Sequence, residues 1–194
     1  MSTDTTRETA ATERDELREL LRHRSIRFGN FVLSSGARST YYIDARRTTM
    51  SGRGQFLIGQ LGLAAMDAAN WHPDLVGGLT LGADPVAYAI AHAAAIAGRT
   101  LDAFTVRKEP KSHGTGRRIE GSFEPGAAVV IVEDVITTGE SALRAAAAVQ
   151  EEGGKVLGVL ALVDRNEGGR DRILAAGYDV VSLFNVRELI EQPK

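Results

Sequence analysis

Apolar residues follow two different spacings along this chain, and the alternation predicts strands followed by helices. Short runs rich in Val, Leu and Ala are typical of buried strands, whereas the segments between them repeat apolar residues at helical spacing. The expected strands cover residues 31–33, 41–43, 75–81, 101–106, 128–133, 156–163 and 180–184. The expected helices cover residues 13–24, 54–69, 85–98 and 140–152, with a short helix after residue 165 and a helical turn at the C-terminus. Strands alternating with helices over residues 75–184 predict an α/β fold, a doubly wound and mostly parallel sheet.

Polar segments set the limits of this predicted domain. Residues 1–12 are polar and lack the apolar run of a secretory signal, so we expect a disordered tail there and one domain over residues 13–194. No apolar run approaches the length needed to cross a bilayer, and we expect no membrane partner. Pro110, Gly114 and Gly116 disfavour regular structure over residues 107–121, which predicts a long loop.

Composition narrows the classes of function. The chain has no cysteine, which excludes disulfides, a thiol nucleophile and a Cys-ligated metal site, and which fits a cytoplasmic protein. Its formal net charge of −2 at pH 7 gives no reason to expect nucleic acid as a partner.

The most informative stretch is VVIVEDVITTGES, over residues 129–141. A β-branched run ends in Glu133 and Asp134, and a turn bearing hydroxyls and a glycine then leads into an Ala-rich helix. Backbone N–H groups at such a turn, with the positive end of the helix dipole, can hold a phosphate. The carboxylates can accept hydrogen bonds from ribose hydroxyls or face a hydrated Mg²⁺. An ordinary strand-to-helix turn with a Thr cap is the alternative interpretation.

Other polar segments follow predicted strands at 82–85, 107–121 and 164–165. In an open parallel sheet, ligands bind beyond the C-terminal ends of the strands, so these segments are expected to converge on one site. The basic loop at 107–121 is expected to bring positive charge onto a leaving group and to exclude water. A solvated surface loop is the alternative.

Three of these segments resemble known enzymes. VVIVEDVITTGES resembles the motif by which type I phosphoribosyltransferases bind phosphoribosyl pyrophosphate (PRPP). The loop RKEPKSHG from Arg107 resembles the catalytic loop of the orotate phosphoribosyltransferases, and FGNFVLSSGARSTYYIDAR, residues 28–46, resembles their N-terminal hood signature. Ser34 stands where several members carry a substrate-contacting Lys. Pro85 and Val86 replace a Tyr-Lys pair, which leaves the loop at 82–85 with backbone contacts only.

The resemblance implies the reaction, the cofactor and the assembly. Orotate and PRPP would give orotidine 5′-monophosphate and pyrophosphate, a step of pyrimidine biosynthesis, with Mg²⁺ bound to PRPP. A small hood over about residues 25–50 and a homodimer with shared active sites are also implied. We expect no direct protein ligand for the metal, which PRPP would mainly hold, with Asp134 as the one candidate.

Roles carry over to this chain by position. The implied catalytic residues are Lys108, Lys111, His113 and Asp134, with His113 as a candidate proton donor. The implied PRPP-binding residues are Arg107, Lys108, Lys111, His113, Glu133, Asp134, Val135, Ile136, Thr137, Thr138, Gly139, Glu140 and Ser141. The implied orotate-binding residues are Thr137 and Arg165.

Two other functions share parts of this pattern. A purine phosphoribosyltransferase would keep the PRPP motif but recognise a neutral base, which the basic loop and Arg165 disfavour. A non-catalytic regulator that binds nucleic acid would need a DNA-binding element, and the residues before Ile26 leave room for one helix and a tail.

Overall fold

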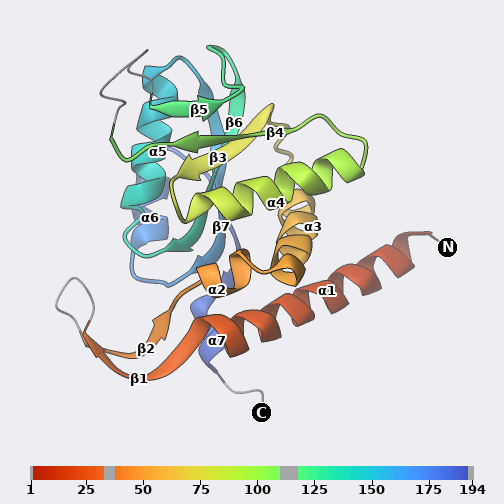
Figure 1. The fold of residues 1–194 in the computed structure, drawn as a ribbon, viewed down its shortest axis with the longest axis vertical. Helices are drawn as coiled ribbons and strands as arrows, with labels where there is room; N and C mark the ends of the chain where they lie inside the picture. The colour runs from red at the N-terminus through yellow and green to blue at the C-terminus, as the bar shows by residue number, and fades with distance from the viewer. Residues whose placement is uncertain (1, 33–37, 110–117, 192–194) are drawn as a thin grey trace.

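A six-stranded sheet forms the centre of the computed structural model, which describes residues 2–32, 38–109 and 118–191 and side chains from residue 11 onward (Figure 1). The order across the sheet is β5 (Ile119–Gly121), β4 (Asp102–Val106), β3 (Leu75–Leu79), β6 (Ala128–Ile136), β7 (Lys155–Asp164) and β8 (Val180–Asn185). Neighbouring strands run parallel except β5, which pairs antiparallel with β4. The predicted mostly parallel sheet is therefore confirmed.

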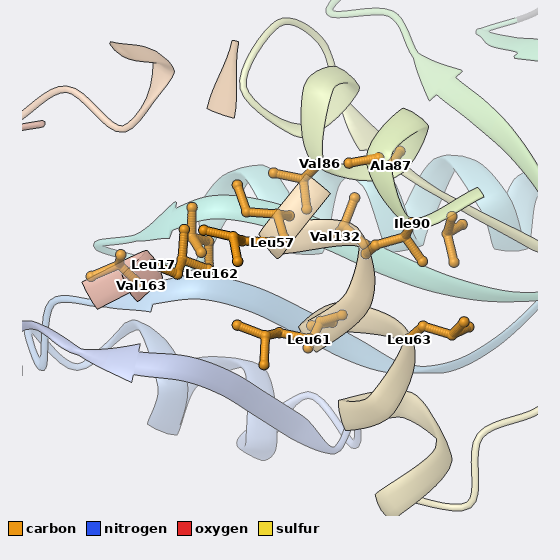
Figure 2. Close-up of a cluster of buried hydrophobic side chains, with 14 of the residues drawn as sticks. Leu17, Leu57, Leu61, Leu63, Val86, Ala87, Ile90, Val132, Leu162 and Val163 are labelled. Atoms are coloured by element: carbon orange, nitrogen blue, oxygen red, sulfur yellow. The ribbon is translucent and has the colours of Figure 1, made fainter. Parts of the chain in front are cut away.

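Helices cover both faces of this sheet. Helices α3 (Gly52–Ala68) and α4 (Ala83–Ile96) pack on one face, and α5 (Glu140–Glu151) and α6 (Gly169–Ala175) on the other (Figure 1). Strand β6 shows why both faces are apolar. Val130 and Val132 join the cluster with α3 and α4, part of which Figure 2 shows, while Val129 and Ile131 join the cluster with α5. The near-continuous apolar run of this strand thus reflects burial on two sides.

The N-terminal elements form a hood beside the sheet. Helix α1 (Ser2–Ser25) leads into an antiparallel hairpin of β1 (Ile26–Val32) and β2 (Arg38–Ile43), followed by the short helix α2 (Arg46–Thr49). The backbone N–H of Asp44 donates to Ser25 O at 2.9 Å, and the buried hydroxyls of Ser25 and Thr48 lie 2.8 Å apart. These bonds fix the point where the hairpin returns to the main domain. The turn expected at Ser35 and Gly36 lies outside the described residues.

Some boundaries differ from the expected ones. Helix α1 begins at Ser2 rather than Glu13, so the segment expected as a disordered tail has a helical backbone. Its Glu, Arg and Ala residues favour helix, and they extend a helix already anchored by the buried Leu17 and Leu21. Strand β6 runs on to Ile136. Strand β5 and helix α2 were not expected, because three or four residues carry no readable periodicity.

The last helix of the described residues is α7 (Val186–Ile190), which packs against α1. Arg14 Nη2 donates to Glu188 Oε2 at 2.7 Å and to Leu183 O at 3.0 Å. In the described parts of the chain, no helix is both long and apolar enough to cross a membrane.

Candidate active site

A polar cavity of about 310 Å³ opens at the C-terminal ends of β3, β6 and β7, below the hood. Five separate segments contribute its walls. The lining residues are Ile43, Asp44, Ala45, Arg46, Leu79, Thr80, Leu81, Gly82, Lys108, Glu133, Asp134, Val135, Thr137, Ser141 and Arg165. The structure therefore brings the predicted acidic pair, phosphate turn, basic loop and Arg165 to one place, as the parallel sheet requires.

The acidic pair lies inside β6, which continues to Ile136, rather than after it. The backbone N–H of Val135 donates to Asp134 Oδ1 at 2.9 Å, which orients that carboxylate. Gly82 lies directly against it, because a Cβ at this position would be 2.6 Å from Asp134 Oδ1. Any larger residue would displace Asp134, so Gly82 contributes space as well as backbone.

Burial controls the charge of both carboxyl groups. Burial raises the pKa of Glu133 to about 8, and the neighbouring charge of Asp134 adds to the rise. Glu133 is 9% exposed, and its Oε2 has no hydrogen-bond partner among the described residues. Burial also raises the pKa of Asp134, but the Val135 N–H and the charge of Arg46 oppose the change. Glu133 is therefore largely protonated at pH 7, and its Oε2 is available for a hydrogen bond with a ligand.

The phosphate turn forms a smaller, adjoining hollow of about 80 Å³. It is lined by Glu133, Val135, Ile136, Thr137, Thr138, Gly139, Glu140 and Ser141. Gly139, immediately before α5, has φ +75°, and a Cβ there would lie 2.7 Å from Gly169 O. Only glycine fits this conformation and this contact without strain. The turn thus presents backbone N–H groups and hydroxyls at the positive end of a helix, an arrangement that favours a phosphate.

Arg165 follows β7 and lies beside the phosphate turn. The strand register pairs Ile136 with Asp164, and the backbone N–H of Arg165 donates to Ile136 O at 3.0 Å. The Arg165 side chain is only 9% exposed; its guanidinium lies 5.4 Å from the ring centroid of Tyr41, and Nη2 is 2.8 Å from Glu167 Oε1.

The pairing of this guanidinium is incomplete. Neither Nε nor Nη2 of Arg165 makes a geometrically sound hydrogen bond within the described chain, so the contact with Glu167 counts as an ion pair only. A buried guanidinium with unused donors is suited to a flat anion.

Comparison with known proteins identifies this arrangement. Residues 57–185 match the family of phosphoribosyl transferase domains. An orotate phosphoribosyltransferase of Aquifex aeolicus is 46% identical over 181 residues, which span 92% of this chain and 98% of the relative. The chain belongs to the orotate phosphoribosyltransferase family.

Solved structures agree with this assignment. Mycobacterium tuberculosis H37Rv orotate phosphoribosyltransferase in complex with Fe(III) dicitrate has a TM-score of 0.83 and 48% identity, with 92% of this chain and 99% of that chain covered. The same mycobacterial enzyme in complex with PRPP has a TM-score of 0.75 and 43% identity, with 92% of each chain covered.

The basic loop of this phosphoribosyltransferase is only partly described. Lys108 lines the cavity, and its carbonyl oxygen accepts a hydrogen bond from Arg144 Nη2 at 3.0 Å. Arg107 is not among the lining residues, because its Nη1 pairs with Glu120 Oε1 on β5 at 3.2 Å. In this conformation Arg107 stabilises the base of the loop. Lys111 and His113 lie outside the described residues.

Several lining residues were not expected from the sequence as contacts. Thr80 and Leu81 were assigned to a strand that in fact ends at Leu79, and Arg46 was noticed only as the end of the hood signature. The loop expected over 82–85 is also shorter, since residues 83–85 form the first turn of α4. No group of three or more His, Asp or Glu side chains that could hold a metal ion occurs among the described residues.

Proposed function

We propose that this protein transfers the 5-phosphoribosyl group from PRPP to orotate and releases pyrophosphate. The observation that carries the proposal is the position of Arg165, a buried cation with unused donors beside a phosphate turn and an acidic pair. The base orotate carries a carboxylate that such a guanidinium can bind in a bidentate manner. A neutral purine base has no carboxylate that could accept hydrogen bonds from the unused donors of this buried guanidinium.

The cavity residues suit a reaction that separates charge. Breaking the bond between C1′ and the diphosphate oxygen leaves positive charge on the ribose and negative charge on the diphosphate. Glu133 and Asp134 hold the ribose hydroxyls near the developing cation, and residues 137–141 hold the 5′-phosphate. Lys108 meets the diphosphate, and Lys111 and His113 join it when the loop closes. Catalysis then comes from orientation and electrostatic stabilisation rather than from a protein nucleophile.

The proposal includes Mg²⁺ as cofactor. Mg²⁺ prefers oxygen ligands and keeps several of its waters, and the carboxylate of Asp134 on the cavity wall fits such a hydrated ion. Bound mainly through PRPP, Mg²⁺ would neutralise diphosphate charge, and Asp134 would face it.

A substrate panel tests the assigned reaction. We expect the absorbance of orotate to change only when PRPP and Mg²⁺ are both present, and adenine or xanthine to give no product. Turnover of a purine base without turnover of orotate would assign the protein to the purine branch of the family.

We also propose a cytoplasmic homodimer in which each active site uses a loop from the partner. Mixing His113→Ala with Asp134→Asn tests this arrangement, because one site of the mixed dimer would contain no altered residue if His113 acts in the partner's site. Partial recovery of activity is expected, up to about a quarter of the wild-type value for random mixing. No recovery, despite subunit exchange, would contradict shared sites.

A further inference from the structure

Arg46 is a cation on the cavity wall that the roles assigned so far leave unused. It is the first residue of α2, its side chain is 48% exposed, and it lines the same cavity as Lys108 and Asp134. Its Nε donates to Asp44 Oδ1 at 2.9 Å. No hydrogen bond or ion pair within the described chain engages its two Nη atoms, so the end of the guanidinium remains available to a ligand.

The backbone that carries Arg46 is held firmly. Ile43, just before the turn, pairs with Ile26 in the hairpin, and the Asp44 N–H bonds to Ser25 O. Two residues after Arg46, Thr48 is fully buried and its hydroxyl meets that of Ser25. Asp44 then restricts the guanidinium itself. This support orients the side chain before any ligand arrives, which reduces the entropy lost on binding.

The ion pair with Asp44 contributes little as a structural bond. Pairs this exposed to solvent are weak, because water and salt screen them. Asp44 instead orients the guanidinium through Nε, and the two Nη atoms remain available to a ligand in the cavity. A role in ligand binding accounts for this arrangement better than a role in folding.

Neighbouring groups show which half of the cavity Arg46 serves. Its charge counteracts the rise that burial causes in the pKa of Asp134, which indicates that the two groups are close. Asp134 in turn lies against Gly82, in the loop after β3. Helix α2 packs against α3 and α4, which cover one face of the sheet (Figure 1). Arg165 follows β7, which neighbours β6 on the side opposite β3.

The two halves of the cavity therefore carry separate cations. Arg165 lies next to Tyr41 on the β7 side, where a flat base can stack. Lys108 follows β4, and Arg46 is close to Asp134, which touches Gly82 in the loop after β3. A diphosphate has more negative charge than one lysine can neutralise, and the fork of an arginine matches pairs of phosphoryl oxygens.

We infer that Arg46 binds the diphosphate of PRPP and of the product pyrophosphate from the hood side of the cavity. This inference rests on the proposed function for the identity of the diphosphate donor. Because charge on the diphosphate grows as the bond to C1′ breaks, Arg46 stabilises the departing group together with Lys108. Asp44 is then a positioning residue that acts through Arg46.

Three variants test the inference. Arg46→Gln removes the charge and keeps most of the side chain, and Arg46→Lys keeps the charge without the fork. Arg47→Gln is the matched control, because Arg47 is the next residue of α2, is exposed and is not among the lining residues. Michaelis constants are measured for PRPP and orotate in the forward direction and for pyrophosphate in the reverse direction. Calorimetry measures the binding of pyrophosphate with Mg²⁺ without any turnover.

We expect Arg46→Gln to raise the Michaelis constants for PRPP and pyrophosphate by about tenfold, with that for orotate changed less than about twofold. Arg46→Lys should be intermediate, and Arg47→Gln should match the wild type. An unchanged pyrophosphate affinity in Arg46→Gln, or an increase confined to orotate, would overturn the inference. If the wild type does not turn over orotate, the proposed function fails, while the calorimetric comparison still decides the role of Arg46.

Discussion

Replacing Glu133 by Gln should change the pH dependence of stability in a defined direction. In the folded, ligand-free protein the pKa of Glu133 is about 8, against an ordinary value of 4.5. Between these values the folded protein keeps a proton at Glu133 that the unfolded chain has released. The free energy of unfolding of the wild type therefore falls as the pH rises through this window, by about 1.4 kcal/mol per pH unit from this group. Gln cannot titrate, so the variant lacks this contribution.

The test compares the free energies of unfolding of Glu133→Gln and the wild type. Between about pH 5.5 and about pH 7.5, the free energy of unfolding of Glu133→Gln should rise relative to that of the wild type by about 3 kcal/mol, as an upper value for a group this buried. For a chain of this length that corresponds to a relative shift in Tm of about 5–10 °C. The Gln amide leaves a buried polar group of its own, which offsets the gain by an amount that does not depend on pH.

Denaturant unfolding of both proteins without substrate or metal, at several pH values, measures the difference. The other titrating groups are common to both proteins and largely cancel. A difference that stays constant within about 0.5 kcal/mol across this range, or that shrinks as the pH rises, would refute the account of Glu133 as a carboxyl protonated by burial.

Three further changes probe the remaining parts of the site. Lys108→Ala should lower kcat by about a hundredfold or more, because a cation facing the leaving diphosphate is lost; calorimetry should show Mg·PRPP binding largely retained, and an unchanged kcat would contradict the role. Arg165→Lys should raise the Michaelis constant for orotate by about tenfold or more while that for PRPP stays nearly constant, because Lys lacks the planar fork; equal changes for both substrates would argue against an orotate contact. Gly139→Ala should cost about 1–3 kcal/mol in denaturant unfolding and weaken PRPP binding, because the residue has φ +75° and a Cβ there would crowd Gly169 O; full stability with normal PRPP affinity would show that the turn adapts.

Local features of the site were predictable from the sequence. A strand, a turn with Gly139 and a helix N-terminus follow one another within thirteen residues, so their geometry depends mainly on neighbours in the chain. The alternation of strands and helices likewise predicted the doubly wound sheet, because each element must bury its apolar residues against the next. That order also placed Lys108 and Arg165 after the C-terminal ends of their strands, where the cavity forms.

Long-range packing decided the rest. Gly82 lies against Asp134 because β3 and β6 are neighbours, although about fifty residues separate the two in sequence. Arg107 turns to Glu120 on an edge strand too short to be recognised, so its place in the motif did not give its contact.

The charge state of Glu133 and the position of Arg46 show the same difference between local sequence features and long-range packing. The sequence determined that an acidic pair ends a buried apolar run, but the pKa of Glu133 depends on how much water the folded chain excludes. The sequence also determined a hood signature ending at Arg46, while the packing of α2 against α1, α3 and α4 brought that side chain to the cavity. Properties set by adjacent residues were readable in the chain, and properties set by burial and by contacts between distant segments required the tertiary structure.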